Sequence, residues 1–135
     1  MAKILVVDDH MPTRELLRAL FQYKGHQVVL AAGGPEAIVA TADEMPDLII
    51  ADVVMPGMDG FTFVRMLREH TECKSAPVAM MSASLDEDKA RLLSEQCGAV
   101  DYLAKPFEPE HALALVSRML LRSRDGESEG RRNAS

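Results

Sequence analysis

Residues 48–52 read Leu-Ile-Ile-Ala-Asp, an uninterrupted apolar run that ends in a carboxylate. Similar short runs rich in branched residues recur along the chain and alternate with longer segments of helical period. Because these runs are continuous rather than alternating in polarity, they predict parallel strands covered by helices on both faces. We expect the strands at Lys3 to Val7, Gln27 to Ala31, Leu48 to Ala51, Val78 to Met81 and Ala99 to Leu103.

Helix start and stop signals lie between the expected strands. Pro12 suits a first helical turn, and Gly25 suits the left-handed position that ends a helix. A second helix is expected from Pro35 toward Glu44. Asp59 is a good N-cap for a third helix, because its carboxylate can accept a hydrogen bond from the first turn.

Two further helices complete the alternation of strands and helices. Ser84 and Glu87 have the spacing of a capping box for a fourth helix, which Gly98 can close, and a fifth is expected from about Glu108 to Arg122. Helical spacing predicts apolar faces at Leu16, Leu17, Leu20 and Phe21, at Phe63, Met66 and Leu67, and at Ala112, Leu113, Val116, Met119 and Leu120.

The chain length allows one folded domain. A chain of 135 residues can build one hydrophobic core, and 47% hydrophobic with 27% charged residues is the composition of an ordinary globule. After Arg122 the only apolar residue is Ala134, so ordering this segment would bury little. We therefore expect residues 1–122 to form the domain and residues 123–135 to be a disordered tail or a truncated linker.

Charge and composition disfavour several classes of protein. Acidic residues outnumber basic ones by 21 to 15, so no direct nucleic-acid partner is expected. Cys73 and Cys97 offer no disulfide framework, and with the four histidines they show no repeated metal-ligand spacing. No run approaches the roughly 18 apolar residues that span a bilayer, and Asp8 and Asp9 interrupt any signal-peptide pattern. We expect a cytoplasmic protein with no membrane partner.

Polar side chains follow four of the expected strands. Asp8 and Asp9 follow the first strand, Asp52 the third and Ser82 the fourth, and the fifth leads to Lys105. The carboxyl ends of parallel strands share one edge of the sheet, so these side chains should share a crevice. Carboxylates about 4 Å apart repel by roughly 4 kcal/mol at an effective dielectric near 20, so this crevice needs positive charge.

Magnesium and Lys105 together can supply that charge. Mg²⁺ accepts one or two carboxylates, keeps several waters and can bridge to a phosphoryl oxygen. A carboxylate beside a metal, an amine and a hydroxyl is equipped for phosphoryl transfer to an aspartate. Taken singly, each residue also suits an ordinary loop, since Asp52 favours a turn and Lys105 precedes a proline. Their joint placement favours the chemical interpretation.

Four separated motifs resemble those of response-regulator receiver domains of two-component signalling. They are Ile4 to Asp9, Asp47 to Gly60, Pro77 to Ala83 and Tyr102 to Phe107, and the match covers Lys3 to about Arg122 in order. The resemblance implies an α/β, flavodoxin-like (βα)5 fold with a five-stranded parallel sheet of order 2-1-3-4-5. It implies a signalling receiver rather than an enzyme, with self-catalysed phosphorylation and autodephosphorylation.

The resemblance also implies a role for each polar residue. Asp52 is implied as the phosphoacceptor. Asp8, Asp9 and Asp52 are implied as ligands of Mg²⁺, together with the backbone carbonyl of Val54.

The resemblance further implies a conformational switch. Ser82 and Lys105 are implied to contact phosphoryl oxygens, with a cis bond between Lys105 and Pro106. Tyr102 matches an aromatic residue that changes rotamer, and we expect it to turn inward on phosphorylation. That motion would change the face formed by the fourth helix, the fifth strand and the fifth helix.

The implied partners are proteins. The phosphoryl donor would be a phosphohistidine on a sensor histidine kinase or a histidine phosphotransfer protein. The recipient of the signal would be a downstream effector or a fused output domain, and a homodimer through the switch face is a further option.

Two other classes of function stay open at this point. A phosphatase could use Asp8 or Asp9 as its nucleophile, although the usual Asp-x-Asp spacing is absent and Asp52 would then have no role. A receiver-like interaction module could bind partners without ever carrying phosphate. The complete set of polar residues expected for phosphoryl transfer argues against this alternative.

Overall fold

The computed structural model describes residues 1–70, 72, 75–83 and 86–133, in which strands and helices alternate along the chain. The strands are β1 (Lys3–Val7), β2 (Gln27–Ala31), β3 (Leu48–Asp52), β4 (Val78–Ser82) and β5 (Asp101–Ala104). The helices are α1 (Met11–Tyr23), α2 (Gly34–Glu44), α3 (Gly60–His70), α4 (Glu87–Gln96) and α5 (Pro109–Asn133). The expected alternation is therefore confirmed.

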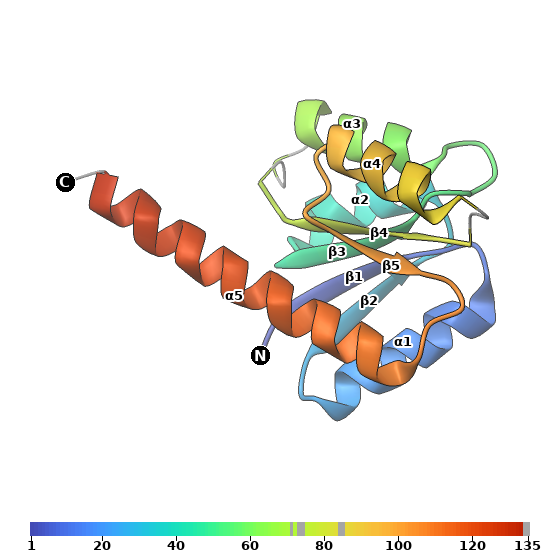
Figure 1. The fold of residues 1–135 in the computed structure, drawn as a ribbon, viewed down its shortest axis with the longest axis horizontal. Coiled ribbons are helices and arrows are strands. Elements are labelled where there is room, and N and C mark those ends of the chain that lie inside the picture. Colours follow the sequence, from blue (N-terminus) through green and yellow to red (C-terminus); the bar gives the residue numbers. More distant parts are fainter. Residues whose placement is uncertain (71, 73–74, 84–85, 134–135) are drawn as a thin grey trace.

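All neighbouring strands pair in parallel, in the order β2-β1-β3-β4-β5. Helices α1 and α5 cover one face of the sheet, and α2, α3 and α4 cover the other (Figure 1). This is the doubly wound α/β architecture that the sequence motifs imply. None of the helices in the described part of the chain is long and apolar enough to cross a membrane.

The strands divide their side chains between two hydrophobic cores. On β3, Ile49 packs with α2 and α3 on one face, and Leu48 and Ile50 pack with α1 and α5 on the other. All residues of β3 and β4 are buried, as expected for strands covered on both faces. Strand β2 lies at a sheet edge and is only partly buried, so its apolar run overstates its burial.

The helix ends mostly follow their sequence signals. Gly25 and Gly98 adopt the expected positive φ angles of 87° and 99°. Asp59 accepts a hydrogen bond from the amide of Thr62 at 2.8 Å, which confirms it as a cap for α3. The N-cap of α4 is Asp86 rather than the expected Ser84. The Asp86 carboxylate accepts a hydrogen bond from the Lys89 amide at 3.0 Å. Ser84, like Cys73, lies outside the described residues.

The expected face of α1 and the expected start of β5 need correction. Leu16 is 43% exposed, because the buried face of α1 is formed by Leu17 and Phe21. Strand β5 begins at Asp101 rather than Ala99, whose amide instead donates to the Ser94 carbonyl in the turn that ends α4.

Helix α5 continues to Asn133 instead of ending at Arg122. Its last part projects beyond the body of the domain (Figure 1). Adding a residue to an existing helix needs no new nucleus, so a polar segment can extend a helix whose earlier turns are packed. The expected helix end was wrong for this reason.

Candidate functional site

The sheet order places the expected polar residues at one edge. Asp8 and Asp9 follow β1, Asp52 and Ser82 are the last residues of β3 and β4, and Lys105 follows β5. Strands β1, β3, β4 and β5 are consecutive neighbours in the parallel sheet, so their carboxyl ends lie side by side. The Lys105 amide donates to the Ser82 carbonyl at 2.8 Å, which fixes the backbone of the lysine beside the end of β4.

The Lys105 amine joins two carboxylates. Its Nζ lies 2.6 Å from Asp8 Oδ2 and 2.8 Å from Asp52 Oδ2. Asp8 is fully buried and Asp52 is 7% exposed. A single partly buried cation therefore neutralises part of the charge of two buried acids, which is the spatial convergence that the sequence predicts.

Asp9 adds a third carboxylate from the exposed side. Oxygen atoms of Asp8, Asp9 and Asp52 all lie within 4.8 Å of one another. Three carboxylates and one ammonium group leave a net charge of two minus, and hard oxygen donors are the ligands that Mg²⁺ prefers. The residues present therefore fit a divalent cation in charge and in donor type.

Burial and neighbouring charge shift the acidity of the site. Burial raises the pKa of Asp52, and the nearby charge of Asp8 raises it further, while the hydrogen bond from Lys105 opposes both effects. Burial alone would lower the pKa of Lys105, but its hydrogen bonds to Asp52 and Asp8 raise it above its ordinary value. The Lys105 amine therefore stays charged. The carboxylates of Asp8 and Asp52 still repel each other, and this repulsion favours binding of a further cation.

Comparison with known proteins identifies the family. A family model described as the response regulator receiver domain matches residues 4–117. The chain belongs to this family. It is thus a receiver domain of the response regulators of two-component systems.

Relatives of the receiver occur both alone and within longer chains. The chain is 34% identical to protein PilH of Pseudomonas aeruginosa over 120 residues, which cover 89% of this chain and 98% of PilH. It is 38% identical to response regulator PleD of Caulobacter vibrioides over 138 residues, which cover 97% of this chain but only 30% of PleD. It covers 52% of the transcriptional regulatory protein GltR of P. aeruginosa, at 37% identity over 94% of this chain.

Solved structures agree with this assignment. Chemotaxis protein CheY4 of Vibrio cholerae matches with a TM-score of 0.81 and 36% identity, over 88% of this chain and 98% of CheY4. NtrX of Brucella abortus matches with a TM-score of 0.86 and 26% identity, over 96% of this chain and 29% of NtrX.

Two residues that support the receiver's site had no role assigned from the sequence. Gly60 begins α3, and a Cβ there would collide with the carbonyl oxygen of Asp52 and with the methyl group of Met80. Arg14 on α1 donates to the backbone carbonyl of Asp8 at 2.7 Å. Gly60 ends the motif Asp47 to Gly60, so the resemblance already marks its position. Nothing in the sequence signals the contact of Arg14.

The remaining expected residues also lie near the site. Ser82 is 3% exposed, and the Lys105–Pro106 bond is cis. The amide of Val54 donates to Asp52 Oδ1 at 3.3 Å, and its side chain is 72% exposed. The role of the Val54 carbonyl as a metal ligand stays a prediction.

Tyr102 differs from the expectation of an outward ring that turns inward later. It is 6% exposed, and its hydroxyl donates to the Ser82 carbonyl at 3.4 Å. The ring is thus already inside the fold in this structure. The expected outward starting position of Tyr102 is wrong for this structure.

Proposed function

We propose that the receiver accepts a phosphoryl group on Asp52 from a phosphohistidine of a sensor histidine kinase or phosphotransfer protein. The observation that carries the proposal is the bonding of one partly buried amine, Lys105, to both Asp8 and Asp52. The remaining net negative charge supports Mg²⁺ binding by Asp8, Asp9 and Asp52, with the Val54 carbonyl as a further ligand. When bound, Mg²⁺ offsets negative charge on the transferring group.

The chain's own residues perform the transfer. A carboxylate oxygen of Asp52 forms a bond to phosphorus while the bond from phosphorus to the donor imidazole nitrogen breaks, and the imidazole takes up a proton. Lys105 neutralises charge on the phosphoryl oxygens, and the hydroxyl of Ser82 donates a hydrogen bond to one of them. Hydrolysis of the acyl phosphate by water returns the free Asp52 carboxylate and releases inorganic phosphate.

The output of the switch lies on α4, β5 and α5. Movement of Ser82 and Lys105 toward the new charge changes the contacts of Tyr102, since its hydroxyl bonds the Ser82 carbonyl. The partner would be a downstream effector, a fused output domain or a second copy of the chain. Relatives of both lengths, PilH and PleD, support a receiver that works alone or within a longer protein.

Intact-mass analysis with acetyl phosphate and Mg²⁺ tests the proposal. The parent chain should gain the mass of one phosphoryl group, and Asp52→Asn should gain none. Asp43→Asn is the matched control, because it removes an exposed carboxylate on α2, and it should label like the parent. Fragment masses should place the label on Asp52.

Other outcomes would favour the alternatives. A covalent phosphate on Asp8 or Asp9 would support an aspartate-nucleophile phosphatase. Failure of the parent to label would support an interaction module that carries no phosphate.

A further inference from the structure

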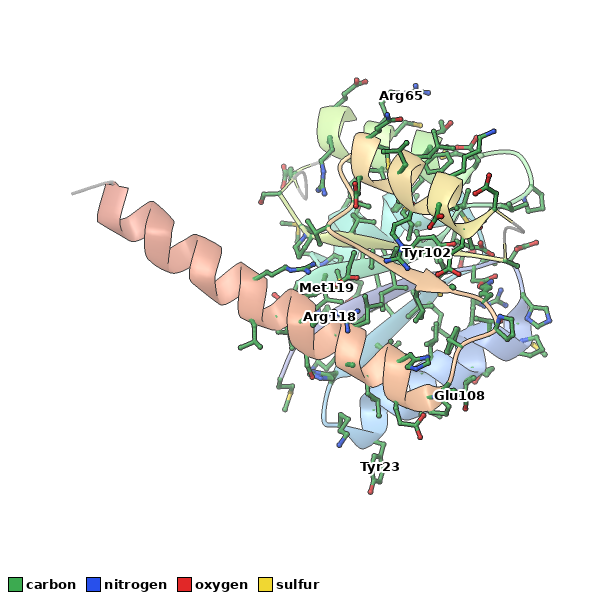
Figure 2. The ribbon with its side chains drawn as sticks, in the orientation of Figure 1. Tyr23, Arg65, Tyr102, Glu108, Arg118 and Met119 are labelled. Carbon is green, nitrogen blue, oxygen red and sulfur yellow. The ribbon has the colours of Figure 1, made fainter. Side chains whose placement is uncertain are left out.

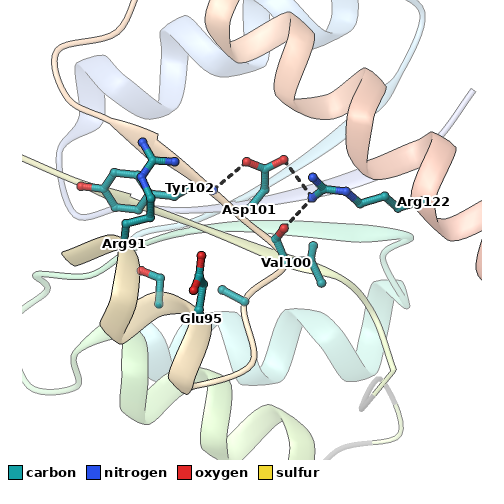
Figure 3. A pocket seen from close by; sticks show the side chains of 8 residues that line it. Arg91, Glu95, Val100, Asp101, Tyr102 and Arg122 are labelled. Carbon is teal, nitrogen blue, oxygen red and sulfur yellow. Dashed lines mark hydrogen bonds and ion pairs between the residues drawn. The ribbon is translucent and has the colours of Figure 1, made fainter. Parts of the chain in front are cut away.

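The ring of Tyr102 is covered by an arginine from α4. The guanidinium carbon of Arg91 lies 5.0 Å from the centre of the Tyr102 ring, within the range of a cation–π contact (Figure 3). Arg91 is itself held by Glu87, whose carboxylate accepts from its Nη2 at 3.1 Å, one helical turn earlier. The ion pair holds the half-exposed guanidinium group over the ring.

The backbone of Tyr102 is linked to α5 only through the neighbouring residue Asp101. Its amide donates to Asp101 Oδ1 at 2.9 Å. Asp101 in turn pairs with Arg118 at 3.1 Å and with Arg122 at 3.0 Å. The ring therefore contacts α4, the hydroxyl contacts β4, and the amide is bonded by Asp101 of β5, which arginines of α5 hold in place.

We infer that Arg91 is a positioning residue that keeps the Tyr102 ring buried before any phosphorylation of Asp52. The inference rests on the proposed switching role of Tyr102. It assigns control of the ring to α4, because the inward state is favoured before phosphorylation. A partner that binds α4 and draws the Arg91 side chain away from the ring, or breaks its pair with Glu87, releases the ring. A cation–π contact of this kind changes the ratio of inward to outward rings by about two- to fivefold.

The tyrosine content of the chain gives a direct readout. The chain has two tyrosines and no tryptophan. Tyr23 is 85% exposed and stands away from the body of the domain (Figure 2). In a Tyr23→Phe background the fluorescence therefore comes from Tyr102 alone. Acrylamide is a neutral quencher, so its bimolecular quenching constant reports exposure of the ring without bias from the charge change.

Removing the cation should expose the ring. Arg91→Ala should raise the quenching constant about twofold, and Arg91→Lys should restore part of the protection because it keeps the cation. Lys89→Ala is the matched control, since it removes an exposed cation from the same helix and should change nothing. Far-UV circular dichroism checks folding. Glu87→Gln provides a second variant that leaves Arg91 in place, with a smaller rise expected.

Adding beryllofluoride and Mg²⁺ separates this inference from the proposed function. The parent ring should stay protected throughout, whereas Arg91→Ala should return to the parent value. If Arg91→Ala is exposed and does not return, Arg91 still positions the ring and the proposed coupling of Asp52 to Tyr102 fails. Equal quenching of Arg91→Ala and the parent, or a parent ring that becomes protected only with beryllofluoride, would overturn the inference.

Discussion

Two charged clusters lie at opposite ends of β5. Beyond its carboxyl end, the amine of Lys105 bonds two carboxylates, Asp8 and Asp52. At its amino end, the carboxylate of Asp101 bonds two guanidinium groups, Arg118 and Arg122. The first cluster has one cation for two acids, and the second has one acid for two cations.

The two clusters also differ in burial and in acidity. The Lys105 side chain is 16% exposed, whereas those of Arg118 and Arg122 are 48% and 53% exposed. Burial raises the pKa of Asp52, whereas the arginines outweigh burial and hold the pKa of Asp101 below its ordinary value. The first cluster is short of positive charge, which suits a binding site. The second is satisfied, which suits a structural link between β5 and α5.

The largest expected effect comes from removing the central cation of the first cluster. Lys105→Met should lower the free energy of unfolding by about 3 kcal/mol without divalent cations, because two buried carboxylates lose their partner. Urea denaturation in the presence of a chelator measures this loss. Lys89→Met, an exposed site on α4, should change it by less than about 0.5 kcal/mol. Equal stability of the two variants would show that the Lys105 amine does not stabilise the buried carboxylates of the first cluster.

The first cluster also depends on close backbone packing, which Gly60 tests. Gly60→Ala should cost about 2 kcal/mol, because its Cβ would press on the Asp52 carbonyl and on Met80. It should also reduce labelling by acetyl phosphate. Gly33→Ala is the control, since no atom lies within 4 Å of its Cβ position and its φ of −172° is open to any residue. A harmless Gly60→Ala would argue against a tightly packed site.

Magnesium should stabilise the parent through the first cluster only. At tenfold excess over its dissociation constant, Mg²⁺ should add about 1.4 kcal/mol to the free energy of unfolding. Removal by a chelator should reverse the gain, and Asp9→Asn should weaken it. Sodium chloride at matched ionic strength controls for screening. A gain of the same size in Asp9→Asn would place the ion elsewhere.

The second cluster should be worth less. Asp101→Asn should cost about 1 kcal/mol, because the arginines are half exposed and such pairs are weak. Urea denaturation measures the loss, and Glu44→Gln, which breaks the exposed pair with Lys3, should cost less than about 0.5 kcal/mol. A loss as large as that of Lys105→Met would contradict the ranking.

Acid should affect the two clusters in opposite directions. The pKa of Asp101 is lowered by folding, so its contribution is present above the unfolded value of about 3.9 and is lost as the pH falls through the lower folded value. The pKa of Asp52 is raised by folding, so protonation in acid relieves a cost that is present at neutral pH. Asp101→Asn should therefore be most destabilising, and Asp52→Asn most stabilising, at neutral pH. Unfolding curves from pH 7 to pH 3 measure both differences.

Much of the fold followed from local sequence. The strand runs at Lys3–Val7 and Gln27–Ala31 have the bounds expected, and Asp52 and Ser82 each extend a strand by one residue. Apolar runs identify strands reliably because burial on both faces tolerates few polar residues. The cap of α4 and the start of β5 depended on competition for hydrogen bonds between neighbouring elements, which periodicity does not describe.

Much of the site followed as well, because the carboxyl ends of parallel strands gather at one edge. The supporting contacts did not: Arg14 reaches the Asp8 carbonyl, and Arg91 covers Tyr102, through the packing of helices on the sheet. Helical spacing predicts that a polar side chain lies off the apolar face of its helix, but it does not predict which residue of another element that side chain contacts.

The sequence by itself determined which segments become strands and which polar groups stand at their ends. Only the tertiary structure decided that Lys105 bonds carboxylates 97 and 53 residues away, that the Tyr102 ring already lies inside, and that Asp101 serves two arginines. The physical reason is that apolar period and capping act within a few residues. Charge pairing acts through space, once right-handed crossovers have brought distant strands together.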